Sequence, residues 1–193
     1  MKKLVWLATA VTAGLLLLLT LFYLWLGGAL LQTLAVTAAT TLYHLVMRLL
    51  VGYAVKAWFP VSVDPQGFWF RERSWEKGLY RLLRVRKWSR RVPTFSPEEF
   101  DARTHTYAQL AWQTCLSEAV HEIIVALGFL SLLFCLFFED PLANLWPFLI
   151  TAILAGGYDM QFVILQRANR PRLLRLAERE QKRRPCNPCE KNK

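Results

Sequence analysis

The chain has 193 residues, of which 54% are hydrophobic and 20% charged, and its 24 lysines and arginines outnumber its 14 acidic residues to give a net charge of +10. Such a charge could suggest nucleic acid, but the charged and the apolar residues are segregated along the sequence. Segregation of this kind is typical of an integral membrane protein, so we expect no nucleic-acid partner and no separate soluble core.

Two long apolar runs open the sequence. Residues 4–26 carry no charge, and a helix of this length, about 35 Å, crosses a ~30 Å hydrocarbon core with some tilt. The run is longer than the ~7–15 apolar residues of a signal peptide, so we interpret it as a retained span. After two glycines a second apolar run covers residues 29–54, in which His44 and Arg48 are the only basic residues.

A long polar segment, residues 61–117, follows the second span and is rich in tryptophan, phenylalanine and arginine. This mixture is typical of the headgroup region of a membrane. Apolar residues from Trp75 to Leu83 recur at helical spacing with basic residues between them, which predicts an in-plane amphipathic helix from Ser74 to Trp88. That helix could be a surface anchor that binds anionic lipid, or it could line a groove for a lipid substrate.

The third and fourth spans are predicted at residues 120–138 and 145–165. Ser96 and Pro97 have the pattern of a helix start, and we expect this helix to run on into the third span. The sequence therefore predicts an all-α integral membrane protein of four transmembrane helices in two hairpins.

The distribution of positive charge predicts the orientation of these spans. Ten lysines and arginines lie between residues 61 and 117 and ten more follow Leu165, whereas the link between spans three and four is acidic. The positive-inside rule then places both termini and the 61–117 segment in the cytoplasm. We expect a multi-pass protein of the bacterial cytoplasmic membrane, with one membrane domain over residues 1–176 and a basic, disordered tail over residues 177–193.

Glu118 and His121 stand where the third span leaves water. They are three residues apart and share a helix face, whereas Glu122 is turned about 100° away. His121 could act as a general base that Glu118 orients, or both could pair with arginines of other helices in a structural role. A Glu-x-x-His pair also occurs in di-iron bundles, but those need a second copy, which this chain lacks.

Other metal patterns fail as well. Val125 occupies the position of the second histidine in the zincin pattern, and the chain has three histidines in all. Cys186 and Cys189 form a single C-x-x-C, and Cys115 and Cys135 are expected to be packing residues. We therefore expect no metal and no cofactor, and a metal-dependent membrane hydrolase is the less favoured alternative.

The fourth span supplies further polar groups. Asp159 lies within the apolar run and needs a partner, for which Arg48 is the candidate, either as a structural pair or within the site. A dense set of donors follows at the end of the span, suited to bind phosphate or carboxylate. This set consists of Gln166, Arg167, Asn169, Arg170 and Arg172.

Three segments in order, "LYRLLRVRKWSRRVPTF", "SEAVHE" and "QRANRPRLLRL", resemble the glycosyl-4,4'-diaponeurosporenoate acyltransferase family of small bacterial membrane proteins. The matching positions are Tyr80, Leu83, Lys87, Trp88, Pro93, Glu118, His121, Gln166, Arg167, Asn169, Arg170 and Arg172. Two positions depart from the family pattern: Ala168 replaces an aromatic residue, and "YDMQ" stands in place of Asn-x-Pro.

The resemblance implies transfer of a fatty acyl group from a thioester, carried by coenzyme A or by acyl carrier protein, to a hydroxyl of a glycolipid-like acceptor such as a glycosylated carotenoid. His121 would be the base and Glu118 its orienting partner, while Arg167, Asn169 and Arg170 would hold the donor. Trp88, Asp159 and Arg48 are further candidates for substrate binding. The alternative is a non-catalytic scaffold that binds anionic lipid, and four thin spans could associate as a homodimer.

Overall fold

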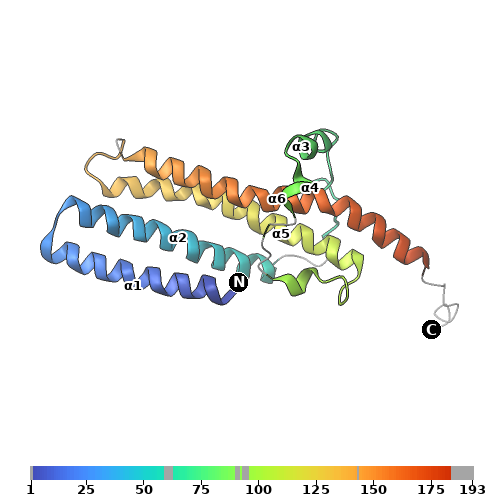
Figure 1. Cartoon of the computed structure of the whole chain (residues 1–193), viewed down its shortest axis with the longest axis horizontal. Helices are drawn as coiled ribbons and strands as arrows, with labels where there is room; N and C mark the ends of the chain where they lie inside the picture. Colours follow the sequence, from blue (N-terminus) through green and yellow to red (C-terminus); the bar gives the residue numbers. More distant parts are fainter. Residues whose placement is uncertain (1, 59–62, 90–91, 93–95, 143, 184–193) are drawn as a thin grey trace.

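The computed structural model describes residues 2–58, 63–89, 92, 96–142 and 144–183, and within these ranges the chain forms helices and no strand (Figure 1). Four helices are long and apolar enough to cross a membrane. They are α1 (Lys2–Leu26), α2 (Ala29–Trp58), α5 (Tyr107–Gly128) with its 3-10 continuation η3 (Phe129–Phe137), and α6 (Leu145–Arg183). The prediction of an all-helical membrane protein is confirmed at this level.

The link between α1 and α2 is made of two glycines whose conformation other residues rarely adopt. Gly27 has φ +66° and Gly28 has φ +98°, a left-handed region in which a Cβ atom is strained. This allows α1 to be followed almost at once by α2, and the two helices lie side by side in Figure 1.

The centre of the bundle is formed by α2, α5 and α6. A small apolar cluster of Met47, Val51 and Ile124 joins α2 to α5. α5 and α6 form the most extensive helix contact of the bundle, and their buried residues include the small side chains of Ala111 and Ala152. α1 packs on α2 and leaves most of its leucines exposed, as expected of a helix whose outer face contacts lipid.

Both α5 and α6 continue well beyond the ends of α1 and α2 (Figure 1). The 39 residues of α6 correspond to roughly 58 Å, almost twice the thickness of a hydrocarbon core. α5 likewise extends beyond its apolar run, because it begins at Tyr107, well before the predicted span at residues 120–138.

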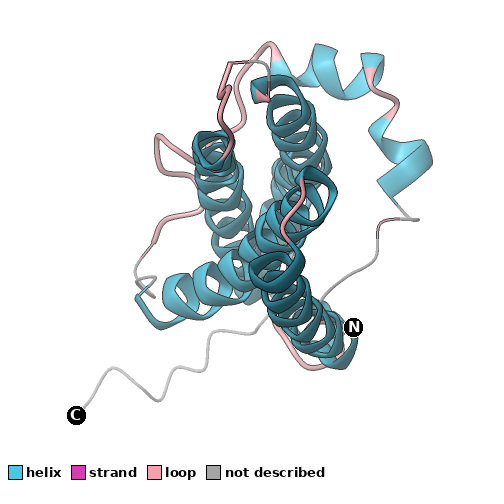
Figure 2. Cartoon of the chain, turned by 90° about the vertical axis from the view of Figure 1, so that its left-hand side faces the viewer, coloured by secondary structure: helices cyan, strands magenta, loops and turns pink. Residues whose placement is uncertain are grey.

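The predicted continuous helix from Ser74 to Trp88 is instead two short helices, α3 (Glu76–Leu82) and α4 (Val85–Trp88), beside the bundle (Figure 2). Arg84 separates them with φ 50°, and this left-handed residue turns the chain. The turn buries Val85, and α4 contacts α6. Helical spacing of apolar residues could not show this break, because the spacing continues through it.

The helix predicted to start at Ser96 is also corrected. Pro97–Phe100 form only a short 3-10 helix, η2, and the Ser96 side chain makes no capping hydrogen bond. α5 has its own start, where Thr106 and Gln109 form a capping box.

Cys115 and Cys135 are free and buried, as predicted. Pro93, Cys186 and Cys189 lie outside the described residues.

Candidate functional site

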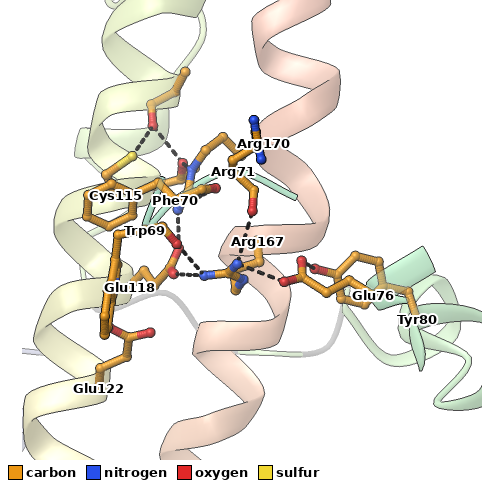
Figure 3. A network of polar contacts seen from close by, with 12 residues as sticks. Trp69, Phe70, Arg71, Glu76, Tyr80, Cys115, Glu118, Glu122, Arg167 and Arg170 are labelled. Atoms are coloured by element: carbon orange, nitrogen blue, oxygen red, sulfur yellow. Dashed lines mark hydrogen bonds and ion pairs between the residues drawn. The ribbon is translucent and has the colours of Figure 1, made fainter. Parts of the chain in front are cut away.

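A buried network of ion pairs lies between α5 and α6 (Figure 3). Its centre is Glu118, which is completely buried. One carboxylate oxygen accepts a hydrogen bond from Arg167 at 2.5 Å, and the other pairs with Arg170, which is only 1% exposed. Arg170 also donates through Nε to the hydroxyl of Thr114 at 2.9 Å. Both oxygens of Glu118 are therefore occupied by guanidinium groups.

The two arginines also hold the loop that precedes α3. Arg167 donates to the carbonyl oxygens of Trp69 at 3.1 Å and Arg71 at 3.3 Å, and Arg170 donates to that of Phe70 at 2.7 Å. The guanidinium of Arg170 also lies over the Phe70 ring, 5.1 Å from its centre. The network thus docks this loop onto the α5–α6 pair.

Glu76 at the start of α3 completes the network. Its carboxylate accepts hydrogen bonds from Arg167 and from the hydroxyl of Tyr80, both at 2.7 Å. Burial tends to raise the pKa of Glu76, but the hydrogen bonds from Arg167 and Tyr80 outweigh it and hold this pKa below its ordinary value. Two carboxylates face two guanidinium groups, so the buried charges of the network balance.

A second polar cluster joins α2, α5 and α6. His121 Nδ1 lies 3.1 Å from one carboxylate oxygen of Asp159, and Arg48 pairs with the other oxygen. Asp159 is only 2% exposed, whereas the His121 side chain is 20% exposed. The imidazole is stacked on Phe162, with ring centres 4.4 Å apart and planes 6° from parallel.

This geometry selects one form of the imidazole. An ionised Asp159 accepts a hydrogen bond from Nδ1–H, and in this tautomer the lone pair of Nε2 is the basic site. Among the described residues, Nε2 of His121 has no hydrogen-bond partner. A histidine fixed by a buried carboxylate and open at its second nitrogen can act as a general base.

The structure therefore gives His121 a different partner from the predicted one. Glu118 was expected to orient His121 because the two are three residues apart, but Glu118 points to the arginines of α6. Asp159 takes the predicted place of Glu118. The third member of the motif, Glu122, accepts a hydrogen bond from the indole of Trp69 at 2.9 Å and so helps to hold the loop.

The remaining predicted residues divide between the interior and the surface. Gln166 is buried, whereas Asn169 and Arg172 are exposed on α6. Trp88 donates its indole N–H to the carbonyl of Leu83 at 3.0 Å, which bridges the turn between α3 and α4. The prediction that Arg48 reaches Asp159 is confirmed.

Sequence reasoning missed Glu76, Tyr80 and Thr114 as members of the network. Glu76 and Tyr80 are four residues apart, a spacing that brings side chains together on a helix and could have indicated the pair. Within the described ranges no group of three or more histidine, cysteine or acidic side chains is placed to hold a metal ion.

Comparison with known proteins adds one match. Residues 66–179 match the model of the glycosyl-4,4'-diaponeurosporenoate acyltransferase family. The matched region includes the docked loop, α3 to α5 and most of α6, and so contains both polar clusters except Arg48. No curated protein and no solved structure gives a significant match.

Proposed function

Since the chain belongs to the glycosyl-4,4'-diaponeurosporenoate acyltransferase family, we propose that it moves a fatty acyl group from a thioester donor to a hydroxyl of a glycolipid-like acceptor. The family is one of acyltransferases in carotenoid biosynthesis, so a glycosylated carotenoid is the first acceptor to test. The donor would be an acyl thioester of coenzyme A or of acyl carrier protein. The pairing of His121 with buried Asp159 is the observation that carries the proposal.

In the proposed reaction, Nε2 of His121 takes the proton of the acceptor hydroxyl while the oxygen attacks the thioester carbonyl. The carbon–sulfur bond of the resulting tetrahedral intermediate then breaks, and the imidazolium returns its proton to the leaving thiolate. Asp159 stabilises the imidazolium, and Arg48 keeps the buried carboxylate neutralised between turnovers. A positioned base of this kind contributes roughly 10²–10⁴-fold to a rate.

The arginines of α6 have a different proposed role from the one first expected. The hydrogen bonds of Arg167 and Arg170 join Glu118, Glu76 and the docked loop. We therefore assign these arginines to positioning the loop beside the reaction site. The exposed residues Asn169 and Arg172 are better placed to meet the phosphates of a soluble donor.

The proposed face of the membrane is the cytoplasmic one. The loop, α3 and α4 lie at the end of the bundle where α5 and α6 project (Figure 1), and this end carries the excess of lysine and arginine. Both termini and the 61–117 segment would then be cytoplasmic, with the four spans forming two hairpins. α3 and α4 would lie at the headgroups.

Lipid mass spectrometry on cells or on purified protein tests the activity. We expect His121→Ala to lower acyl transfer at least about 100-fold and Asp159→Asn to lower it as well, because a neutral amide cannot stabilise the imidazolium. His105→Ala is the matched control, since His105 lies before α5 and its hydrogen bonds in the described part of the chain go to its own turn, to Thr104 and Asp101. Full activity of His121→Ala would refute the assigned mechanism, and an acylated lipid that persists without the gene would refute the function.

A further inference from the structure

A groove of 460 Å³ is lined mainly by residues of α2 and of the first turns of α6. Both helices pack against α5 and η3, which leaves space between them. The groove extends from Thr33 near the start of α2 to Arg48, and on α6 from Pro147 to Ala155. Along α2, the 15 helical steps from Thr33 to Arg48 correspond to roughly 22 Å.

Most of the groove wall is apolar in its chemistry despite its threonines, and His44, Arg48 and Asn144 are its other polar lining residues. Thr33, Thr37 and Thr41 each donate a hydroxyl to the carbonyl one turn earlier in α2, at 2.8 Å. Thr151 does the same on α6, at 2.6 Å from the carbonyl of Pro147. Because these hydroxyls are already satisfied, they present methyl groups, and a hydrocarbon chain can lie against them without leaving a donor unpaired.

One end of the groove meets the proposed base. Arg48 lines the groove and reaches across to Asp159, which follows the lining residue Ala155 by one turn of α6. His44 also lines the groove, and its ring lies close to Gly128 of α5. The ring is 3.8 Å from the position that a Cβ atom on Gly128 would take. Gly128 and His121 are seven residues apart, two turns on one face of α5. His121 therefore lies in line with the groove, just beyond the Arg48–Asp159 pair.

We propose that this groove holds the acyl chain of the donor and that its length sets the chain length transferred. The inference depends on the proposed acyl transfer. In a thioester the hydrocarbon is bonded directly to the carbonyl carbon, so it must start at the base and run away from it. In a glycolipid-like acceptor, a sugar separates the reacting hydroxyl from the hydrocarbon. A groove that ends at Arg48, which pairs with the Asp159 partner of His121, fits the acyl chain of the donor.

Bulky substitutions along α6 test whether the free length of the groove limits the length of the acyl chain. Ala155→Phe places a ring about 6 Å along the helix from Asp159, and Thr151→Phe places one about 12 Å away. We expect both variants to favour shorter chains, with Ala155→Phe accepting the shortest and each losing its longest substrate at least about tenfold. Leu154→Phe is the matched control, because Leu154 is on the same helix but does not line the groove. Its chain-length profile should equal that of the wild type.

Phe138→Ala provides the opposite test at the far end of the groove, where Phe138 is a lining residue. It should extend the profile to longer chains, a gain that misfolding cannot produce. The assay gives the purified variants a series of acyl thioesters in competition and reads the products by mass spectrometry. Unchanged profiles in all three groove variants, with transfer intact, would overturn the groove assignment alone. Absence of transfer by the wild type with every donor would instead overturn the proposed function.

Discussion

Glu118→Gln separates a structural from a catalytic role for the most buried acid among the described residues. The substitution keeps the shape of the side chain and removes its charge. Glu118 is completely buried, and Arg170 beside it is 1% exposed, so the guanidinium would lose its counter-charge where water cannot replace it. Breaking a buried pair from one side typically costs about 3–5 kcal/mol. At about 2–4 °C per kcal/mol for a chain of this size, the melting temperature should fall by roughly 6–20 °C.

Thermal unfolding in detergent, followed by size-exclusion chromatography with fluorescence detection, measures this shift. Acyl transfer is assayed in parallel below the melting temperature of the variant. We expect Glu118→Gln to keep substantial activity per folded molecule, because Glu118 contacts the arginines and His121 contacts Asp159. Glu122→Gln is the control and should melt within a few degrees of the wild type, since its hydrogen bond to Trp69 is exposed. A Glu118→Gln protein that melts like the wild type but has no activity would refute the structural role and indicate that Glu118 takes part in catalysis.

Two further predictions concern the docked loop and the first helix pair. The lowered pKa of Glu76 means that its stabilisation is complete above the ordinary glutamate pKa of about 4.3 and is lost as the pH falls through the lower value of the folded protein. The difference in melting temperature between wild type and Glu76→Gln should therefore be largest near neutral pH and should disappear as the pH falls below about 4. A difference that stays constant across this range would contradict the role assigned to the Glu76 charge. Gly28→Ala should lower the free energy of unfolding by about 1–2 kcal/mol, because φ is +98° at this position. Gly14→Ala is the control: Gly14 is helical with open space around it, so the substitution should be neutral or stabilising by up to about 1 kcal/mol. Equal shifts in melting temperature for the two variants would show that the φ of Gly28 is not the cause.

Much of the architecture could be predicted because it depends on local properties of the chain. The length and apolarity of a run decide whether a helix can cross a membrane, and neither requires knowledge of what the helix packs against. The same reasoning singled out Glu118, His121 and Asp159, since an ionisable group in or beside an apolar run needs a partner wherever it lies. Arg48 was the natural partner of Asp159 because few charges occur in the spans.

The boundaries were less predictable for a physical reason. α5 begins at Tyr107 because the capping box of Thr106 and Gln109 satisfies its first N–H groups, and this start lies outside the apolar run. The break at Arg84 depends on burial of Val85, with α4 in contact with α6, a long-range effect that competes with local helical spacing.

Composition and spacing alone predict four apolar helices that carry a small number of ionisable groups near one end. Which of these groups meet depends on how the helices pack against one another. Neighbours three residues apart on one helix, such as Glu118 and His121, can meet different partners at different heights of the same neighbouring helix, because Asp159 lies about two turns before Arg167 in α6. Glu118 therefore joins the arginines that dock the loop, and His121 joins Asp159 at the end of a groove. Packing angles between helices are set by the summed contacts of many side chains, and a linear pattern of residue types does not contain that sum.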